Sequence, residues 1–364
     1  MNLGRAITLL LMGAVGYVSA GLAQSNSKTE AAKESQPSPI VVRSDGTVEL
    51  PAESVPVSKF LSPEAKAYLT QHLHDMQDPE KLKLDNGVPR FMVGYLERQK
   101  ALYALKKEDT KIAGVHAYVY TPAAGIAEKN KDRVLINLHG GGFSGCWPGC
   151  AELESRPIAG LGQIKVISVD YREGPDHKFP AASEDVATVY RELLKTYKAQ
   201  NIGVFGCSAG GMLTAQSVAW LQKHDLPLPG AIGIFCASAG GFGGDAEYTS
   251  TPLGEARFMP MSDGGITRLG YFSETKPHDP LVSPIDAPEM LAKFPPTLII
   301  TGTRGFEMSS ALYTHSQLVK LGVDADLHVW EGLFHGFFYN PDVPESQEAY
   351  DVIVRFFEKH LGAK

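Results

Sequence analysis

The segment Gly206-Cys-Ser-Ala-Gly210 places Ser208 at a sharp turn between two regular segments. The β-prone residues 202–205 end at this turn, and the helix-forming residues 212–222 follow it. So tight a turn leaves no room for side chains two residues on either side of the serine, and it lifts Ser208 Oγ clear of the sheet at a helix N-terminus. Ser208 is therefore a candidate nucleophile, although the same pattern also occurs in ordinary glycine-rich turns.

A second motif, His139-Gly-Gly-Gly142, follows an apolar run. Attack of a serine on an ester generates an oxyanion, which is stabilised by backbone N–H groups that no side chain obstructs. A glycine run at the end of a strand provides such groups. The two motifs together favour acyl transfer over an ordinary turn at Ser208.

The glycine run has an alternative interpretation as a dinucleotide-binding loop. Gly140, Gly142 and Gly145 satisfy G-x-G-x-x-G, and Asp170 ends the next apolar run as a ribose-binding acid would. Such a loop must open directly into a helix, whereas Pro148-Gly149 is unfavourable inside one. We therefore rank a nucleotide-dependent oxidoreductase below an ester hydrolase.

A serine nucleophile needs a base to accept its proton and an acid that orients the base. Two histidines lie near the last predicted strand, residues 326–330. His328 is inside that strand and is predicted to be a packed core residue. His335 lies on the following loop, before the predicted final helix 344–361, which is where the base should be.

Short apolar segments alternate with helix-forming ones from residue 134 onward, which predicts a mostly parallel sheet with helices on both faces. The predicted strands are 115–120, 134–138, 165–169, 202–205, 231–236, 297–301 and 326–330, and the predicted helices between and after them are 181–198, 212–222 and 344–361.

The chain divides into four predicted segments. Residues 1–23 have a basic start, an apolar run and small residues at the end, which predicts a signal peptide and a secreted or periplasmic protein without stable membrane insertion; an uncleaved anchor is the alternative. Residues 24–54 are a polar leader that we expect to be disordered. Residues 55–114 carry N-terminal helices, one of them over 88–107, and residues 115–364 form the catalytic domain, with a glycine-rich insert at about 240–278.

The charge and the cysteine spacing argue against two further kinds of function, nucleic-acid binding and zinc binding. The net charge is −7 and Lys and Arg form no dense run, which argues against a nucleic-acid partner. Cys146 and Cys150 flank a turn and would form either a small disulfide or two free thiols. Cys207 and Cys236 lie in apolar surroundings and are predicted to be buried packing thiols, and the cysteine spacing does not indicate a zinc site.

Several motifs occur together in the order typical of one family, and this joint pattern resembles the hormone-sensitive-lipase-like branch of the α/β-hydrolases. The resemblance spans the chain from about residue 115 to the C-terminus. The motifs are His139-Gly-Gly-Gly-Phe143, Asp170-Tyr-Arg172, Pro175-Asp-His-Lys-Phe-Pro-Ala-Ala182, Gly206-Cys-Ser-Ala-Gly-Gly211, Asp279-Pro-Leu-Val-Ser-Pro284 and His335-Gly-Phe337.

The resemblance implies Ser208 as nucleophile, His335 as general base, and an oxyanion hole made by the N–H groups of Gly141, Gly142 and Ala209. It also implies an α/β-hydrolase fold with an N-terminal helical cap, hydrolysis of small or medium carboxylic esters, and no cofactor or metal.

The chain departs from the family pattern at the expected acid. The family places an aspartate two residues after Thr303, where this sequence has Gly305. Glu307 is the only carboxylate between the predicted strand 297–301 and the next helix, and its side chain is one methylene longer than that of aspartate. We therefore predict Glu307 as the triad acid, the alternative being a solvated residue at a helix start.

The sequence thus predicts a serine carboxylesterase with a Ser-His-Glu triad and an acyl-enzyme intermediate. The alternative is a non-catalytic α/β-hydrolase fold that binds a small ligand, which the missing aspartate motivates. Phe143, Trp147 and Tyr95 are predicted to contact the substrate, with core packing as the alternative for each.

Overall fold

The computed structural model describes residues 40–258 and 270–362, which fall into two compact units divided after Ser54. In the first unit, β1 (Val41–Val42) and β2 (Val48–Glu49) form an antiparallel hairpin where the sequence predicted a disordered leader. The Asp45 side chain accepts a hydrogen bond from the Thr47 N–H at 2.9 Å, which stabilises the turn. The predicted signal peptide, residues 1–23, lies outside the described residues.

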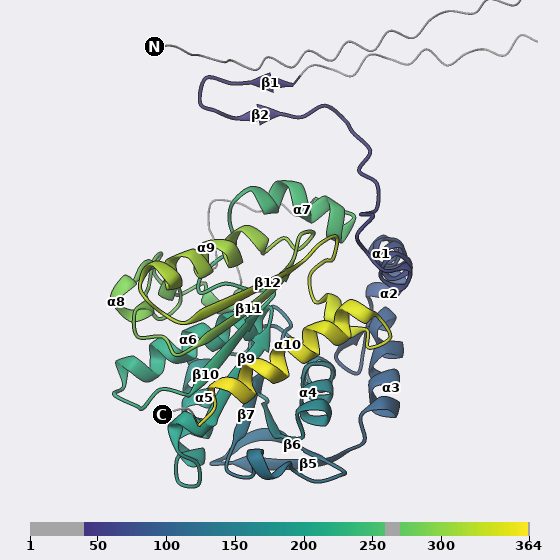
Figure 1. The fold of residues 1–364 in the computed structure, drawn as a ribbon. Helices are drawn as coiled ribbons and strands as arrows, with labels where there is room; N and C mark the ends of the chain where they lie inside the picture. Colours follow the sequence, from purple (N-terminus) through teal and green to yellow (C-terminus); the bar gives the residue numbers. More distant parts are fainter. Residues whose placement is uncertain (1–39, 259–269, 363–364) are drawn as a thin grey trace, which may run out of the picture. The chain divides into compact units, whose positions relative to one another are not determined.

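The second unit is built on an eight-stranded sheet in the order β12-β11-β10-β9-β7-β8-β6-β5 (Figure 1). The strands from β7 to β12 run parallel, and β6 is antiparallel to both of its neighbours, β8 and β5. This confirms the predicted mostly parallel sheet. The bounds are β5 Leu105–Ile112, β6 Val115–Pro122, β7 Val134–Leu138, β8 Lys165–Val169, β9 Ile202–Cys207, β10 Ala231–Phe235, β11 Thr297–Gly302 and β12 Ala325–Trp330.

Helices cover both faces of this sheet (Figure 1). Side chains of α5, α6 and α9 belong to one buried apolar cluster, and those of α1, α3, α4 and α10 belong to a second. The bounds are α1 Pro63–Asp75, α2 Pro79–Leu82, α3 Val93–Leu102, α4 Gly149–Gly162, α5 Ala181–Leu193, α6 Ala209–Lys223, α7 Asp245–Glu255, α8 Pro288–Leu291, α9 Met308–Lys320 and α10 Pro344–His360.

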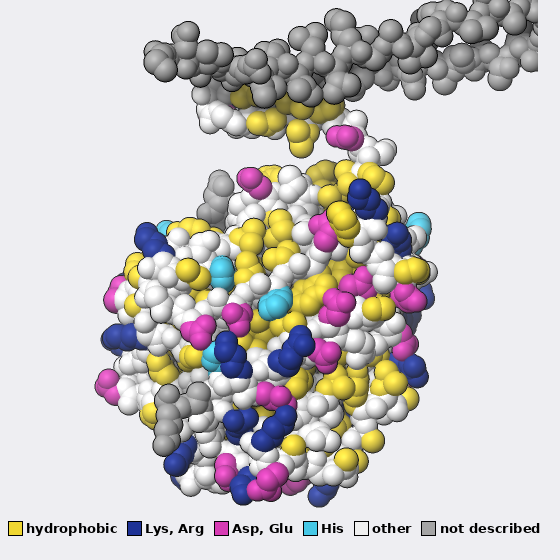
Figure 2. Space-filling view, viewed as in Figure 1, with side chains coloured by type: hydrophobic (Ala, Val, Ile, Leu, Met, Phe, Trp, Pro, Cys, Tyr) yellow, Lys and Arg dark blue, Asp and Glu magenta, His cyan; other side chains and the backbone are white. Residues whose placement is uncertain are grey.

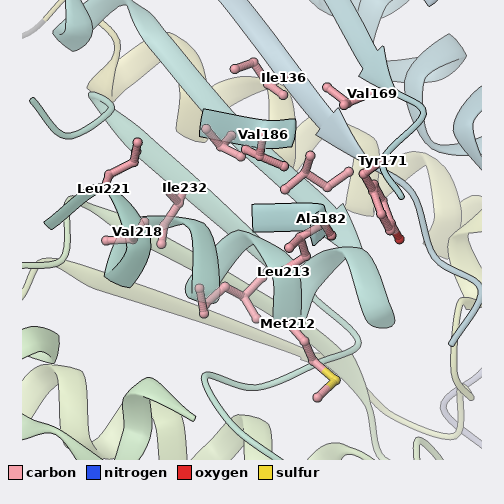
Figure 3. Close-up of a cluster of buried hydrophobic side chains, with 14 of the residues drawn as sticks. Ile136, Val169, Tyr171, Ala182, Val186, Met212, Leu213, Val218, Leu221 and Ile232 are labelled. Atoms are coloured by element: carbon pink, nitrogen blue, oxygen red, sulfur yellow. The ribbon is translucent and has the colours of Figure 1, made fainter. Parts of the chain in front are cut away.

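The central strands are buried on both faces, because successive side chains enter different clusters. Ile136 and Val204 belong to the first cluster, whereas their neighbours Leu135 and Phe205 belong to the second. Figure 3 shows part of the first cluster, where Val186 of α5 and Leu213 of α6 lie near strand residues such as Ile136. Burial of this kind explains why these strands appear in the sequence as continuous apolar runs.

The segment 88–112 differs from its prediction. The sequence predicted one helix over 88–107, but α3 covers only Val93–Leu102 and β5 begins at Leu105. β5 is largely exposed, and it pairs with β6 from Leu105↔Pro122 to Ile112↔Val115. A polar edge strand of this kind depends on its partner, which local sequence does not reveal. The sheet therefore begins ten residues before the predicted domain boundary.

Helix α4 was missed because Pro148-Gly149 was expected to be unfavourable in a helix. The structure places Pro148 at the N-cap and begins the helix at Gly149. A Cβ at Gly149 would overlap the Val88 side chain and lie 2.8 Å from the Asn86 carbonyl oxygen. The glycine thus permits close packing against an earlier segment instead of interrupting the helix.

The prediction that His328 is a packed core residue was wrong. β12 is the last strand at its end of the sheet, and the central part of the strand is exposed at His328 and Val329. Within residues 40–258 and 270–362, only β11 pairs with this strand, so one long edge of β12 has no neighbouring strand there.

The surface of the second unit carries charges of both signs. On the face drawn in Figure 2, Lys and Arg side chains are interspersed with Asp and Glu. Among the helices of the described residues, none is long and apolar enough to cross a membrane.

Two leucines of α9 test how the helix is oriented. Leu318 is fully buried, whereas Leu312 is 39% exposed. We expect Leu318→Ala to lower the free energy of unfolding by about 2–5 kcal/mol, because the substitution leaves a cavity in the core. The matched control Leu312→Ala should cost about 1 kcal/mol or less. Chemical denaturation measures both, and equal losses would contradict the orientation of this helix.

Candidate active site

Ser208 occupies the turn between β9 and α6 in a backbone conformation that non-glycine residues rarely adopt, with φ 58° and ψ −123°. The turn passes close to the end of β7. A Cβ at either Gly206 or Gly210 would overlap the Leu138 carbonyl oxygen. Both glycines are therefore required by this close approach, as the sequence predicted. The serine lies at the N-terminus of the 15-residue helix α6, whose dipole favours negative charge there.

The glycine run lies beside the serine. A Cβ at Gly140 would be 3.4 Å from Ser208 Cβ. Gly141 has φ +121° and Gly142 has φ +65°, both in the left-handed region that favours glycine, and Gly142 is exposed. Ala209 is the first residue of α6. Of the residues predicted to form the oxyanion hole, Ala209 thus follows the serine directly, and Gly141 follows the glycine that lies beside it.

His335 and Glu307 form a hydrogen-bonded pair. The Nδ1–Oε2 distance is 2.9 Å, and the Thr301 hydroxyl donates to the other carboxylate oxygen, Oε1, also at 2.9 Å. The Phe306 ring stacks on the imidazole at a centroid distance of 4.4 Å. Glu307 is fully buried, whereas the His335 side chain is 19% exposed. The carboxylate is therefore held inside the protein and the imidazole reaches solvent.

The Glu307 carboxylate lies beside Gly305, the position at which the family resemblance implies an aspartate. A Cβ at Gly305 would lie 2.8 Å from Glu307 Cδ and 2.9 Å from Oε2. The Glu307 carboxylate therefore occupies the space into which a side chain at position 305 would extend. The alternative of a solvated residue at a helix start is wrong, because Glu307 has no exposed surface.

The end of β10 contacts both the serine and the His335–Glu307 pair. The Ser208 N–H donates to the Phe235 carbonyl at 2.9 Å. The next residue, Cys236, places its sulfur within 4.8 Å of ligand atoms of both Glu307 and His335. These three side chains are of the types that bind metals, although the imidazole and carboxylate are already bonded to each other. The predicted burial of Cys236 and Cys207 is confirmed.

The pair also controls the charge of the imidazole. Burial disfavours the protonated ring, but the charge of Glu307 and its hydrogen bond outweigh burial and raise the pKa of His335 to about 9. Burial alone would raise the pKa of Glu307, yet His335 and the Thr301 hydroxyl hold it below its usual range. The two side chains therefore stabilise each other as an ion pair.

The N-terminal helices contact the loop that carries His335. His72 of α1 stacks on Phe334 at 3.6 Å, and Tyr68 packs against the same ring at 5.0 Å. Tyr95 of α3 meets Tyr68 edge to face at 5.6 Å. Tyr68 therefore lies between Tyr95 and Phe334, and Phe334 directly precedes His335. Its predicted contact with substrate stays a prediction.

The other two predicted substrate contacts lie near the glycine run. Phe143 is fully buried and stacks on Tyr271 at 5.1 Å, which gives it a packing role beneath the loop. Trp147 is half-buried, with its ring 4.6 Å from Tyr118. It lies inside the loop closed by a disulfide between Cys146 and Cys150, the alternative that the sequence left open. Substrate contact by Phe143 or Trp147 stays a prediction.

Two buried polar residues of this region were missed in the sequence. Thr301 is the last residue of a predicted strand and lies 6 positions before Glu307. A hydroxyl so close to the predicted acid could have indicated a hydrogen bond between the two side chains. The second residue is Glu154, which accepts a hydrogen bond from the Gly140 N–H at 2.8 Å. No local pattern distinguishes it, because it lies on a helix that was not predicted.

Comparison with known proteins adds independent evidence. The sequence model of a family described as alpha/beta hydrolase fold matches residues 135–339. The acetyl-hydrolase of Streptomyces hygroscopicus is 28% identical over 234 residues, which cover 63% of this chain and 77% of that protein. The carboxylesterase/phospholipase LipF of Mycobacterium tuberculosis is 29% identical over 232 residues, which cover 62% of this chain and 61% of LipF.

Solved structures agree. The crystal structure of an esterase superposes with a TM-score of 0.72 and 29% identity, covering 86% of this chain and 98% of that one. An esterase from the bacterial hormone-sensitive lipase family superposes with a TM-score of 0.67 and 25% identity, covering 83% and 99%.

NMR titration of the imidazole tests the ion pair. We expect the pKa of His335 to be raised to about 9 in the unmodified protein. In Glu307→Gln the pKa should fall below the usual value of about 6.5, because burial remains while the negative charge is lost. Glu255→Gln is the matched control, since Glu255 is also buried and its charge acts on His335 with a smaller effect. A pKa that Glu307→Gln leaves unchanged would contradict the assigned pairing.

Proposed function

Because the chain belongs to the α/β-hydrolase fold family, we propose that its carboxylic ester hydrolase activity uses Ser208 as nucleophile, His335 as general base and Glu307 as the acid of the triad. The observation that carries this proposal is the position of Glu307. Its carboxylate fills the space of a side chain at Gly305 and bonds His335 Nδ1 at 2.9 Å. The acid has therefore moved along the sequence by two residues.

The reaction follows from the arrangement. Ser208 Oγ attacks the ester carbonyl carbon while His335 Nε2 accepts its proton. The N–H groups of Gly141, Gly142 and Ala209 stabilise the oxyanion. The intermediate collapses by breaking the bond to the alkoxy oxygen, and the imidazolium protonates the departing alcohol. Water, activated by the same imidazole, then hydrolyses the acyl-enzyme.

Glu307 keeps its charge throughout this cycle. It holds the imidazole with Nδ1 protonated and Nε2 directed to the serine, and it stabilises the imidazolium when the ring accepts a proton. The Thr301 hydroxyl fixes the second carboxylate oxygen, so the side chain does not rotate away. The raised pKa of His335 means that the neutral, active form of the base increases as the pH rises toward about 9.

Small to medium carboxylic esters are the proposed substrates. One relative is named an acetyl-hydrolase and another a carboxylesterase/phospholipase, and both names describe ester hydrolysis. Trp147 and Tyr95, which are half-buried near the glycine run and the His335 loop, are the proposed contacts, with Phe143 supporting the loop from below. A binding protein without catalysis would not require the Glu307–His335 pair.

The relocated acid is tested by moving it back. We expect Glu307→Ala to lower kcat for p-nitrophenyl butyrate by up to about 10⁴-fold, as loss of a triad acid does. Gly305→Asp in that background should recover at least about tenfold, because the new carboxylate enters the vacated space. Gly305→Asp alone should reduce activity, since its side chain would overlap the Glu307 carboxylate.

Ser208→Ala is the control for hydrolysis that does not depend on the triad, and p-nitrophenyl acetate is the second substrate. Full activity of Ser208→Ala would refute the serine mechanism. If Glu307→Ala leaves the activity unchanged, another carboxylate must be the acid of the triad, and Glu255 is the next buried candidate. Saturable ligand binding without turnover by the unmodified protein would support the non-catalytic alternative.

We also propose that the enzyme is exported. The Cys146–Cys150 disulfide supports this proposal, because disulfides persist in oxidising compartments. Residues 1–23 have the composition of a signal peptide. Mass spectrometry of the protein produced with its full N-terminus in a secreting bacterium should find a mature chain that begins just after Ala20 or Ala23. An intact N-terminus in the cytoplasmic fraction would contradict export.

A further inference from the structure

A buried carboxylate lies behind the oxyanion loop. Glu154 of α4 is 3% exposed. Its Oε1 accepts hydrogen bonds from the Gly140 N–H at 2.8 Å and the Tyr339 hydroxyl at 3.0 Å. Its Oε2 accepts from Asn137 Nδ2 at 2.9 Å and from the Cys207 N–H at 3.2 Å. Four donors therefore converge on one side chain.

This set of donors matches the ionised form of Glu154. A carboxylate has about four acceptor positions and no donor, which matches this set. The backbone N–H groups of Gly140 and Cys207 can only donate, and the orientation of the Asn137 amide is set by the Ser168 hydroxyl, which donates to Asn137 Oδ1 at 3.0 Å. Burial raises the pKa of Glu154 to about 7, and the four hydrogen bonds oppose a larger increase.

The four donors come from the segments that form the candidate site. Asn137 belongs to β7, Gly140 to the glycine run, and Cys207 directly precedes the serine. Tyr339 lies four residues after the proposed base, in the short helix Phe337–Tyr339. A Cβ at Gly140 would be 3.4 Å from both Glu154 Oε1 and Ser208 Cβ. Gly140 thus contacts both the Glu154 carboxylate and the proposed nucleophile, Ser208.

We propose that Glu154 is a positioning residue for ester hydrolysis, which holds the glycine run against the serine turn by binding the N–H groups of Gly140 and Cys207. The inference rests on the function proposed above. Because Glu154 binds the Gly140 N–H, the peptide that follows is fixed, and the N–H groups of Gly141 and Gly142 are left for the oxyanion. A loop placed with this accuracy stabilises the transition state more than the bound ester.

Glu154→Gln is the sharpest variant, because it keeps the size of the side chain and removes two acceptor positions. Either orientation of the new amide directs its NH₂ group at a backbone N–H, that of Gly140 or that of Cys207. One of these contacts must therefore break, and the glycine run must shift. We expect kcat for p-nitrophenyl butyrate to fall by about 10- to 100-fold, because displacements of about 1 Å have effects of this size. KM should change by less than about twofold.

Inhibition by butylboronic acid separates positioning from a merely structural role. Boronic acids form a tetrahedral adduct with a serine hydroxyl that resembles the intermediate of ester hydrolysis. If Glu154 positions the oxyanion donors, the inhibition constant should rise by about the same factor by which kcat falls. A general loosening of the fold would instead lower the thermal midpoint and affect KM and boronate binding without this correlation.

Glu152→Gln is the matched control on the same helix. Glu152 is also buried, but its partners are the cationic side chains of Lys107 and Arg156. Its variant should keep kcat within about twofold, whatever it costs in stability. Should Glu154→Gln fail to fold, Tyr339→Phe removes a single donor and leaves three hydrogen bonds. That variant should fold and lower kcat severalfold.

The outcomes distinguish this inference from the proposed function. An unmodified protein that hydrolyses neither p-nitrophenyl ester refutes the proposed function, and the inference with it. If the unmodified protein is active and Glu154→Gln keeps kcat and boronate affinity at the level of Glu152→Gln, only the role of Glu154 is refuted. Unchanged kcat in Tyr339→Phe, where that variant is used instead, refutes it equally.

Discussion

The close approach of two backbone segments, at the ends of β7 and β9, is the constraint on which the site depends. The Leu138 carbonyl lies so near the turn that neither Gly206 nor Gly210 has room for a Cβ. This contact brings the glycine run that follows β7 beside the serine that follows β9. Parallel strands end at the same edge of a sheet, so residues far apart in the sequence meet there. Strand pairing therefore places both the proposed nucleophile and the proposed oxyanion donors.

Two buried carboxylates stabilise this edge in different ways. Glu307 is paired with an imidazole and a hydroxyl, so its charge is balanced within the site. Glu154 has no cation among its hydrogen-bond partners, which are four neutral donors. A buried charge is tolerated only where its acceptor positions are filled, and both side chains meet this condition. Glu307 is bonded to the proposed base, His335, and Glu154 lies behind the glycine run.

If Glu307 is the acid of the triad, as proposed, the position of its carboxylate in space matters more than its position in the sequence. The glycine at position 305 leaves space, and a glutamate two residues later returns its carboxylate into that space. The longer side chain compensates for the shift of its backbone origin. Burial and the hydrogen bond from Thr301 then restrict the Glu307 side chain to one conformation. A shorter aspartate side chain would have fewer conformations to lose.

The buried centre of the sheet was predictable, and its edge and flanks were not. Runs such as 134–138 and 165–169 were predicted with the observed bounds, because strands buried on both faces are apolar throughout. β5 is polar and depends on pairing with β6. The start of α4 depends on close packing of Gly149 against Val88. Neither partner is visible from a local window of sequence.

The sequence by itself determined the chemistry: a serine between glycines, a glycine run after a strand, a histidine after the last strand, and one carboxylate near the missing aspartate. The glycine patterns are set by steric demands within a few residues, whereas the histidine was identified by its place after the last strand and the carboxylate by the family resemblance. The tertiary structure decided which carboxylate pairs with His335, that Cys146 and Cys150 are joined, and that Glu154 binds four donors from separate segments. Such contacts join residues 4 to 185 positions apart, and only the folded chain brings their side chains together.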